Sequence, residues 1–320
     1  MVVLFNRNAI FINPYFLDFG VPFFSPYNRA PKGGSLDLVD TSLIFFAGNE
    51  KFYGGFSFNR LPQRYDFTVE NPFTFYVGTL THSVGFWGFS LSGFSSSIKN
   101  FSFTDLISEN GVNLVIPALY YSKRLGRSDI IYFRVAFPWY KEVLVTPTDT
   151  FNSTTKFSGD FSAAYFKENT FQWQYLFIAS YFLRYYNEKY STIQNLLNYD
   201  STKVFSRFNA RLYVIYSPFQ NTFLSLGPIF DSESDSYSLS AVFSAQYEVL
   251  LNLYLYFEYL YGCKWAIQRT GNFESKFFEN DVKGPLLGLR FRKDFLLFVL
   301  DYSFGDRSFS SISVKFDLVR

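Results

Sequence analysis

The chain of 320 residues is long enough for one large domain, and its 23% aromatic content, with 44 Phe and 25 Tyr, is unusually high. Charged residues make up only 18%, which is low for a soluble surface. The net charge of +2 gives no electrostatic footprint for nucleic acid, which is therefore excluded as a partner.

Residues 1–34 are rich in proline, at positions 14, 22, 26 and 31, and carry a Gly33-Gly34 pair. Because proline cannot donate to a β-ladder, we expect an irregular N-terminal segment, which either folds into the lumen as a plug or lies outside the barrel. A cleavable secretory signal is not recognisable, since Arg7 comes early and no small-residue cleavage site follows. Export requires such a signal, so we expect the sequence to be that of the mature protein.

From residue 36 onward, apolar and polar residues alternate in runs that end at turn-forming residues, which is typical of antiparallel strands. We expect strands at 36–46, 51–60, 72–81, 84–95, 111–122, 129–139, 157–166, 171–185, 202–216, 221–230, 236–249, 252–265, 284–292, 295–304 and 308–319. Between them, residues 96–110 are predicted as a loop or short helix. Loops are also predicted at 140–156, 186–201 and 266–283.

The stretch 252–265 shows the pattern most clearly, because Leu253, Leu255 and Phe257 alternate with Tyr254 and Glu258. At about 3.3 Å per residue and a tilt of about 40°, such a strand spans the roughly 30 Å of a bilayer core. No apolar run reaches the roughly 18 residues of a transmembrane helix. A soluble β-sandwich is the alternative, but strand length, low charge and aromatic content disfavour it.

We therefore predict an all-β fold: a single antiparallel transmembrane β-barrel of about 14 strands, within a range of about 12–16. Residues 35–320 form the barrel and residues 1–34 its irregular N-terminal segment. Such a barrel resides in the bacterial outer membrane, in contact with the lipid bilayer and lipopolysaccharide.

Charged residues indicate which face of each strand points inward. In strand 202–216, Arg207 and Arg211 share a face with Asn209, and an Arg turned to lipid costs about 2–4 kcal/mol near the midplane. The same argument predicts these lumen-facing residues: Arg134, Arg207, Arg211, Glu248, Glu258, Arg290, Arg292 and Asp301. The arginines either form a ladder that selects anions or pair with Glu248, Glu258, Asp301 and Asp317 on neighbouring strands.

The predicted inner face is also partly apolar. The apolar lumen candidates are Leu176, Ile178, Phe182, Phe295, Leu297 and Val299. An open water-filled channel does not favour such residues. They either pack against the N-terminal segment or line the path of a hydrophobic ligand.

No catalytic or metal site is expected, and no cofactor. A single His and a single Cys exclude most catalytic triads and thiolate metal sites. His82 and Ser83 are adjacent, but neighbours in a strand point to opposite faces and cannot easily hydrogen-bond. Asp231, Glu233 and Asp235 either bind a hard cation or form a solvated acidic turn. We expect the protein not to be an enzyme.

Two stretches resemble the PorV-like outer-membrane proteins, relatives of the FadL fatty-acid transporters. Ala9, Ile10, Phe11, Asn13 and Pro14 are similar to an early Ala-Ile-Phe-x-Asn-Pro motif of that family, and residues 301–318 to its closing hairpin. The resemblance implies a 14-stranded barrel whose N-terminal segment lies near or in the lumen. FadL members move hydrophobic molecules, whereas PorV members serve protein secretion as carriers or scaffolds.

Three functions therefore stay open. The first is a FadL-like conduit for small hydrophobic molecules. The second is a PorV-like, non-catalytic scaffold that binds a protein partner at the cell surface or in the periplasm. The third is a general diffusion porin, which the inward arginines permit and the apolar inner face disfavours.

Overall fold

The structure is a computed structural model in which the described residues are 33–39, 42–48, 52–58, 65–67, 72–81, 85–102, 105–125, 129–168, 172–192, 198–219, 222–250, 253–270, 273–293, 296–303 and 310–317. The predicted N-terminal plug lies outside them, apart from Gly33 and Gly34, which begin the first strand.

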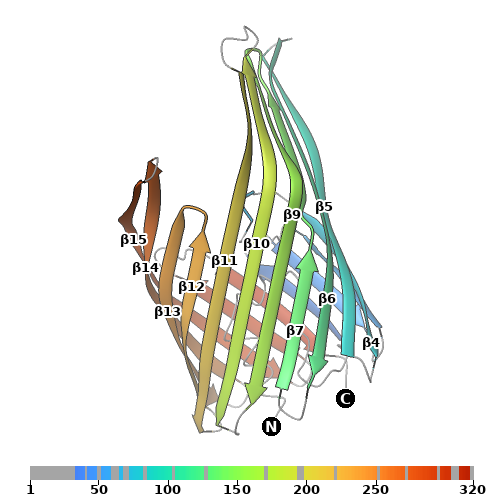
Figure 1. Cartoon of the computed structure of the whole chain (residues 1–320). Coiled ribbons are helices and arrows are strands. Elements are labelled where there is room, and N and C mark those ends of the chain that lie inside the picture. Colours follow the sequence, from blue (N-terminus) through green and yellow to red (C-terminus); the bar gives the residue numbers. More distant parts are fainter. Residues whose placement is uncertain are drawn as a thin grey trace.

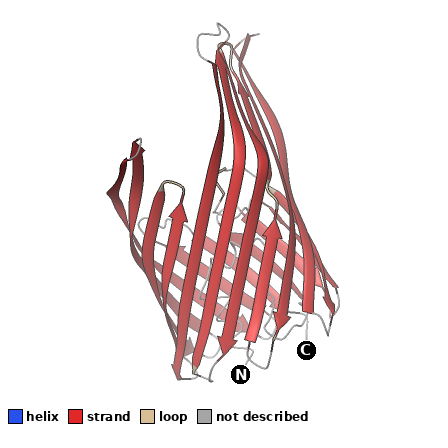
Figure 2. Cartoon of the chain, viewed as in Figure 1, coloured by secondary structure: helices blue, strands red, loops and turns tan. Residues whose placement is uncertain are grey.

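All regular structure in the described part of the chain is β-strand (Figure 2). No helix there is long and apolar enough to cross a membrane. The strands are β1 (Gly33–Val39), β2 (Ser42–Gly48), β3 (Phe52–Phe58), β4 (Phe73–Thr81), β5 (Gly85–Ser102), β6 (Asp105–Arg124), β7 (Asp129–Ala136), β8 (Trp139–Val145), β9 (Asp149–Glu168), β10 (Trp173–Thr192), β11 (Asn198–Phe219), β12 (Thr222–Glu233), β13 (Ser236–Leu250), β14 (Leu253–Thr270), β15 (Phe273–Lys293), β16 (Leu296–Ser303) and β17 (Ser310–Asp317).

The strands form one antiparallel sheet that closes on itself, because β1 pairs with β17 on one side and β2 on the other. β7 and β8 lie one after the other between β6 and β9, since both pair with β6 and both pair with β9. Among the described residues, the 17 strand segments, two of which share one position, therefore occupy 16 positions around the barrel. The predicted all-β barrel is confirmed, with its strand count at the upper end of the range.

Several predicted loops are strands. Residues 96–110, 140–156, 186–201 and 266–283 are mostly β-structure that lengthens the neighbouring hairpins. These segments were predicted as loops because they are polar. Backbone hydrogen bonds between strands, however, also form where neither face of the strand is apolar. The predicted strand 36–46 was also wrong, since β1 ends at Val39, β2 begins at Ser42, and the two pair antiparallel.

The lengthened strands build a wall on one side of the barrel. In Figure 1, β5, β6, β9, β10 and β11 rise well beyond the hairpin of β12 and β13. β11 has 22 residues, whereas β12 has only 12. Cross-strand ion pairs lie on this wall, with Lys189 to Asp200 at 2.8 Å on β10 and β11. Such pairs suit water rather than lipid, so the wall projects beyond the bilayer.

The side chains alternate between an apolar outer face and a buried inner face. On β10, Phe177 is 43% exposed while its neighbours Leu176 and Ile178 are buried. Aromatic pairs lie near strand ends, with ring centroids 4.4 Å apart for Trp173 and Tyr216. A barrel that crosses a bilayer needs an apolar outer face with aromatic residues near the strand ends. The protein is therefore a transmembrane barrel of the outer-membrane type.

The position of β10 in the bilayer predicts that substitution by arginine lowers the stability of the barrel by different amounts at two sites on this strand. Phe177→Arg puts a charge near the bilayer midplane and should destabilise the folded barrel by about 2–4 kcal/mol. Ser191→Arg, on the projecting wall, should cost less than about 0.5 kcal/mol. Urea unfolding in phospholipid vesicles, followed by Trp fluorescence, measures both, and equal costs would show that β10 does not cross the bilayer at Phe177.

Candidate functional site

The barrel wall is interrupted between β7 and β8. Pairing with β9 stops at Ala136, opposite Asp160, and resumes at Lys141, opposite Thr154. Pro138 lies in this break and has no N–H to donate. The break is thus a weak point in the pairing with β9.

Hydroxyl side chains from β9 replace part of the missing ladder. Ser158 Oγ donates a hydrogen bond to the carbonyl oxygen of Pro138. Thr155 Oγ1 accepts one from the backbone N–H of Tyr140, at 3.2 Å. On the other side, the N–H of Phe137 donates to the carbonyl of Pro117 on β6, at 3.0 Å. The break is therefore held by a few local contacts rather than by a regular ladder.

Three residues from the connection between β3 and β4 lie inside the barrel behind this break. Tyr65 and Phe67 are buried, and the side chain of Asp66 is 11% exposed. We call Tyr65–Asp66–Phe67 the inserted segment. It belongs to a cluster of buried residues: Tyr65, Phe67, Leu114, Ile116, Ala118, Ala136, Tyr140 and Phe182.

Aromatic rings seat the inserted segment on the barrel wall. The ring of Phe67 stacks on that of Tyr140, with centroids 4.6 Å apart and planes 7° apart. The ring of Tyr65 lies 4.8 Å from that of Phe182. Each such pair contributes about 0.5–1.5 kcal/mol beyond area burial. Since Ala136 and Tyr140 border the break and belong to the same cluster, the segment covers the break from inside.

A buried ion pair anchors Tyr65. Arg134 on β7 is 4% exposed and donates to Asp160 on β9, with Nη1 and Oδ2 2.5 Å apart. The hydroxyl of Tyr65 donates to the same carboxylate oxygen, at 2.8 Å. Hydrogen bonds to a charged acceptor are about twice as strong as neutral ones. The carboxylate of Asp160 therefore joins the wall to the inserted segment.

A second buried arginine holds Asp66. Arg184 on β10 is 3% exposed, and its Nη1 lies 2.8 Å from Oδ2 of Asp66. Its other nitrogens donate to hydroxyls on β9, to Thr155 Oγ1 at 2.9 Å and Ser153 Oγ at 3.2 Å. Aromatic rings surround the guanidinium, with centroids 5.4 Å away for Phe67, 5.0 Å for Tyr140 and 4.2 Å for Tyr186.

An apolar depression of about 640 Å³ lies on the outer face of β4, β5, β6 and β8. Its lining residues are Phe73, Phe75, Leu91, Gly93, Phe94, Ser95, Asn113, Leu114, Val115 and Trp139. Leu114 is also part of the interior cluster, and Phe94 packs against it. Inner and outer apolar regions thus approach each other beside Trp139, the first residue of β8.

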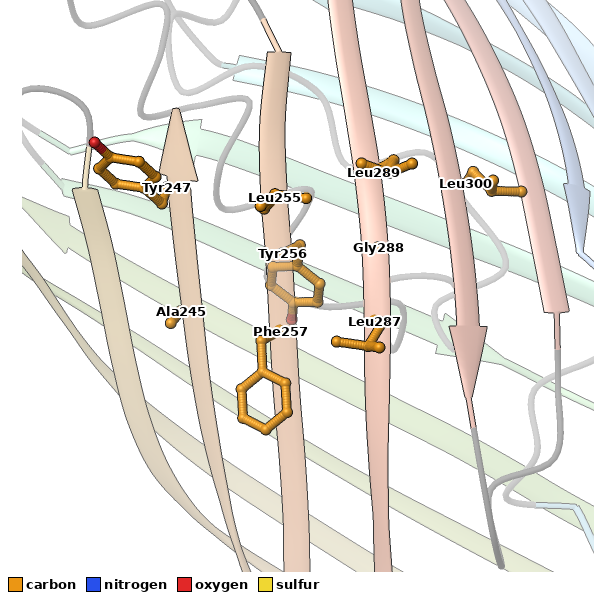
Figure 3. A pocket seen from close by; sticks show the side chains of 9 residues that line it. All are labelled: Ala245, Tyr247, Leu255, Tyr256, Phe257, Leu287, Gly288, Leu289 and Leu300. Carbon is orange, nitrogen blue, oxygen red and sulfur yellow. The ribbon is translucent and has the colours of Figure 1, made fainter. Parts of the chain in front are cut away.

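A second outer depression of about 550 Å³ lies on β13 to β16 (Figure 3). Its lining residues are Ala245, Tyr247, Leu255, Tyr256, Phe257, Leu287, Gly288, Leu289 and Leu300. Gly288, which has no side chain, lies between Leu287 and Leu289, whose side chains are exposed. This depression belongs to the lipid-facing surface and is separate from the interior cluster.

The sequence-predicted site residues fall into three groups. Arg134, Glu258, Leu176, Ile178 and Phe182 are buried, and Arg134 and Phe182 adjoin the inserted segment. Arg207, Arg211 and Glu248 are half-buried. Phe295 and the side chains of Arg290, Arg292, Leu297, Val299 and Asp301 lie outside the described residues, as do His82 and Ser83.

Two of the predicted arginines pair with acids other than those the sequence suggested. Arg134 pairs with Asp160, as above, and Arg207 pairs with Asp231 at 2.5 Å and Glu233 at 3.0 Å. Two carboxylates of the acidic turn are thus engaged by a cation of the chain itself. Among the described residues, no three His, Cys, Asp or Glu side chains gather to hold a metal ion.

Sequence reasoning missed the inserted segment, Asp160 and Arg184. The signal for Arg184 was present, because it shares the inward face of its strand with Gln174 and Ser180 and needs a counter-ion. Its partner Asp66 lies 118 positions away in the sequence, and nothing local identifies it.

No known protein-family profile matches the chain, and no curated protein matches it. Among solved structures, it is similar to the CymD monoaromatic hydrocarbon channel, at 8% identity over 95% of this chain and 93% of that one, with a TM-score of 0.46. The toluene transporter TodX of Pseudomonas putida is 10% identical over 96% and 91%, with a TM-score of 0.43. The copper transporter OprC is 9% identical over 85% and 60%, with a TM-score of 0.37. Likeness this remote says nothing about what the present chain carries.

The buried ion pair of Arg134 and Asp160 leads to a prediction about the free energy of unfolding. Asp160→Leu leaves the buried guanidinium of Arg134 without its carboxylate and should cost about 3–5 kcal/mol of unfolding free energy. The double variant Arg134→Met with Asp160→Leu removes both charges and should recover most of that loss. Urea unfolding of the three proteins in detergent micelles tests this, and equal losses in single and double variants would contradict it.

Proposed function

We propose that the protein is an outer-membrane conduit for small hydrophobic molecules, of the kind that the FadL transporters represent. The observation that carries this is the position of the aromatic cluster. It lies inside the barrel behind the break of β7 and β8, with an apolar depression on the other side of the wall. The function is transport and involves no catalysis.

The interior cluster behind the break is unsuited to a water-filled channel. Phe67 stacks on Tyr140 and lies edge-on to Phe182, and Leu114 and Ile116 of the same cluster are fully buried. Water in a pore of this kind would leave these apolar surfaces hydrated at a cost of about 25 cal/mol per Å². This disfavours the general porin, which needs a polar lumen.

An exit through the barrel wall into the lipid is energetically favourable for a hydrophobic solute. A passage beside Trp139 would join the interior cluster to the lipid-facing depression through Leu114 and Phe94, which border both. A solute taking it would move from one apolar environment to another. Leaving through the wall's projecting end would instead expose it to water and to the ion pairs there.

The passage must be closed at rest, and the inserted segment accounts for that. Its contacts with the wall include aromatic rings, one shared carboxylate and one ion pair. Because no strand pairing involves these residues, the segment could move while the barrel stays intact. Such a movable closure is what a conduit needs.

Permeation through reconstituted protein tests the proposal. Vesicles containing the barrel should take up a neutral aromatic fluorophore faster than empty vesicles. Leu114→Gln puts an amide beside the passage and should slow that uptake about tenfold, which corresponds to about 1.4 kcal/mol of barrier. Leu176→Gln, at an equally buried leucine on β10, is the matched control and should change uptake little.

Two outcomes would overturn the proposal. One is uptake by protein-containing vesicles that equals uptake by empty ones. The other is a steady, large ion conductance of the unmodified protein in a planar bilayer, which would indicate a porin.

A PorV-like scaffold is the second candidate, favoured by the wall that projects beyond the bilayer (Figure 1). A scaffold needs such a surface, whereas a conduit does not. If this function holds, protein extracted in mild detergent should carry a stoichiometric protein partner. Shortening the β10–β11 hairpin should release that partner and leave hydrophobic uptake unchanged, and a bare barrel after extraction would argue against it.

A further inference from the structure

Arg184, Thr155, Ser153, Tyr140 and Phe182 form a preformed slot in the barrel wall. All five belong to strands β8, β9 and β10, so the ladder fixes their backbones. Two hydroxyls hold the guanidinium of Arg184 in place, as described above. We call this arrangement the arginine slot. Only its occupant, Asp66-Phe67, comes from outside the strands.

The occupant presents two chemical groups to the slot. A carboxylate from Asp66 meets the guanidinium of Arg184, 2.8 Å from Nη1. A phenyl ring from Phe67 stacks on Tyr140 and lies edge-on to Phe182, with a centroid distance of 6.5 Å and an angle of 79°. One guanidinium contacts both groups, since its carbon is 5.4 Å from the centre of the Phe67 ring.

These contacts have the chemistry of aromatic-acid recognition. Arginine binds carboxylates through charge-assisted hydrogen bonds and also stacks on aromatic faces. A slot of this design favours a carboxylate and a ring that are joined by a short linker. A neutral hydrocarbon would fill the ring position and leave the buried guanidinium without a counter-ion.

The present occupant fits the slot imperfectly. The second carboxylate oxygen of Asp66, Oδ1, is buried and has no hydrogen-bond partner among the described residues. Burying an unsatisfied acceptor is unfavourable. An occupant that carries this penalty is easier to displace than one with all its hydrogen bonds made.

We propose that the arginine slot binds small aromatic carboxylates, and that Asp66 and Phe67 occupy it as a tethered stand-in for such a ligand. The proposal rests on the proposed function, because it names the substrate class of the same interior site. Binding of the acid displaces the segment that covers the break between β7 and β8. Binding of the acid thus shifts the equilibrium toward the open state.

The experiment is calorimetric titration of the full-length protein in detergent micelles, with empty micelles as the blank. The probes are 3-phenylpropanoate, its neutral analogue ethylbenzene, and hexanoate, which has the carboxylate without the ring. The unmodified protein should bind 3-phenylpropanoate at least about tenfold more tightly than either analogue.

Two variants should move the affinity in opposite directions. Arg184→Gln should weaken 3-phenylpropanoate binding about tenfold or more and leave ethylbenzene binding within about twofold. Asp66→Asn loosens the competing occupant and should tighten 3-phenylpropanoate binding about tenfold, because the slot is then vacant in a larger share of molecules. Asp231→Asn, which takes a carboxylate from Arg207 instead, is the matched control and should not tighten it.

A purely structural role for the Arg184–Asp66 pair predicts weaker binding in both variants, so a loss in Asp66→Asn overturns the inference. Equal affinities for 3-phenylpropanoate and ethylbenzene also overturn it, while leaving the hydrophobic conduit in place. The conduit itself fails only if vesicle uptake of the neutral fluorophore does not depend on the protein, and the two results are therefore distinguishable.

Discussion

Backbone hydrogen bonding in a solvent without water is the constraint on which the rest of this structure depends. Each N–H and C=O inside a bilayer needs a partner within the protein, and strands achieve this only when the sheet has no edge. The pairing of β1 with β17 removes that edge. Where Pro138 interrupts the ladder, the hydroxyls of Ser158 and Thr155 hydrogen-bond to backbone groups at the break. Side chains thus meet the same requirement there.

Closure divides the side chains into two environments and forces charges on the inner side to find partners. Arg134, Arg184 and Arg207 each pair with a carboxylate, and none of the three lies on the outer face. The partners of Arg134 and Arg207 come from neighbouring strands in space. Arg184 differs, because its carboxylate comes from a segment that is not part of the wall. Its charge is compensated only while that segment is seated.

The sequence was sufficient for the fold class and for the two faces of most strands, because period-2 alternation reports burial directly. It was insufficient for the wall, since polar hairpins outside the bilayer show the same composition as loops. The break was hidden too, because Phe137, Pro138 and Trp139 continue the alternation of β7. Tyr65 and Asp66 could not be placed, since their partners Asp160 and Arg184 lie 95 and 118 positions away.

The separation between what spans the membrane and what fills the lumen has a functional consequence. Ladder hydrogen bonds stabilise the barrel, whereas the inserted segment lies outside the strands and contacts the wall through aromatic rings and an ion pair. Losing those contacts exposes a small apolar surface and one arginine but breaks no strand pairing. A state with the segment displaced is therefore a local rearrangement rather than partial unfolding of the barrel. At the break between β7 and β8, the wall could therefore open repeatedly while the strand pairing stays intact.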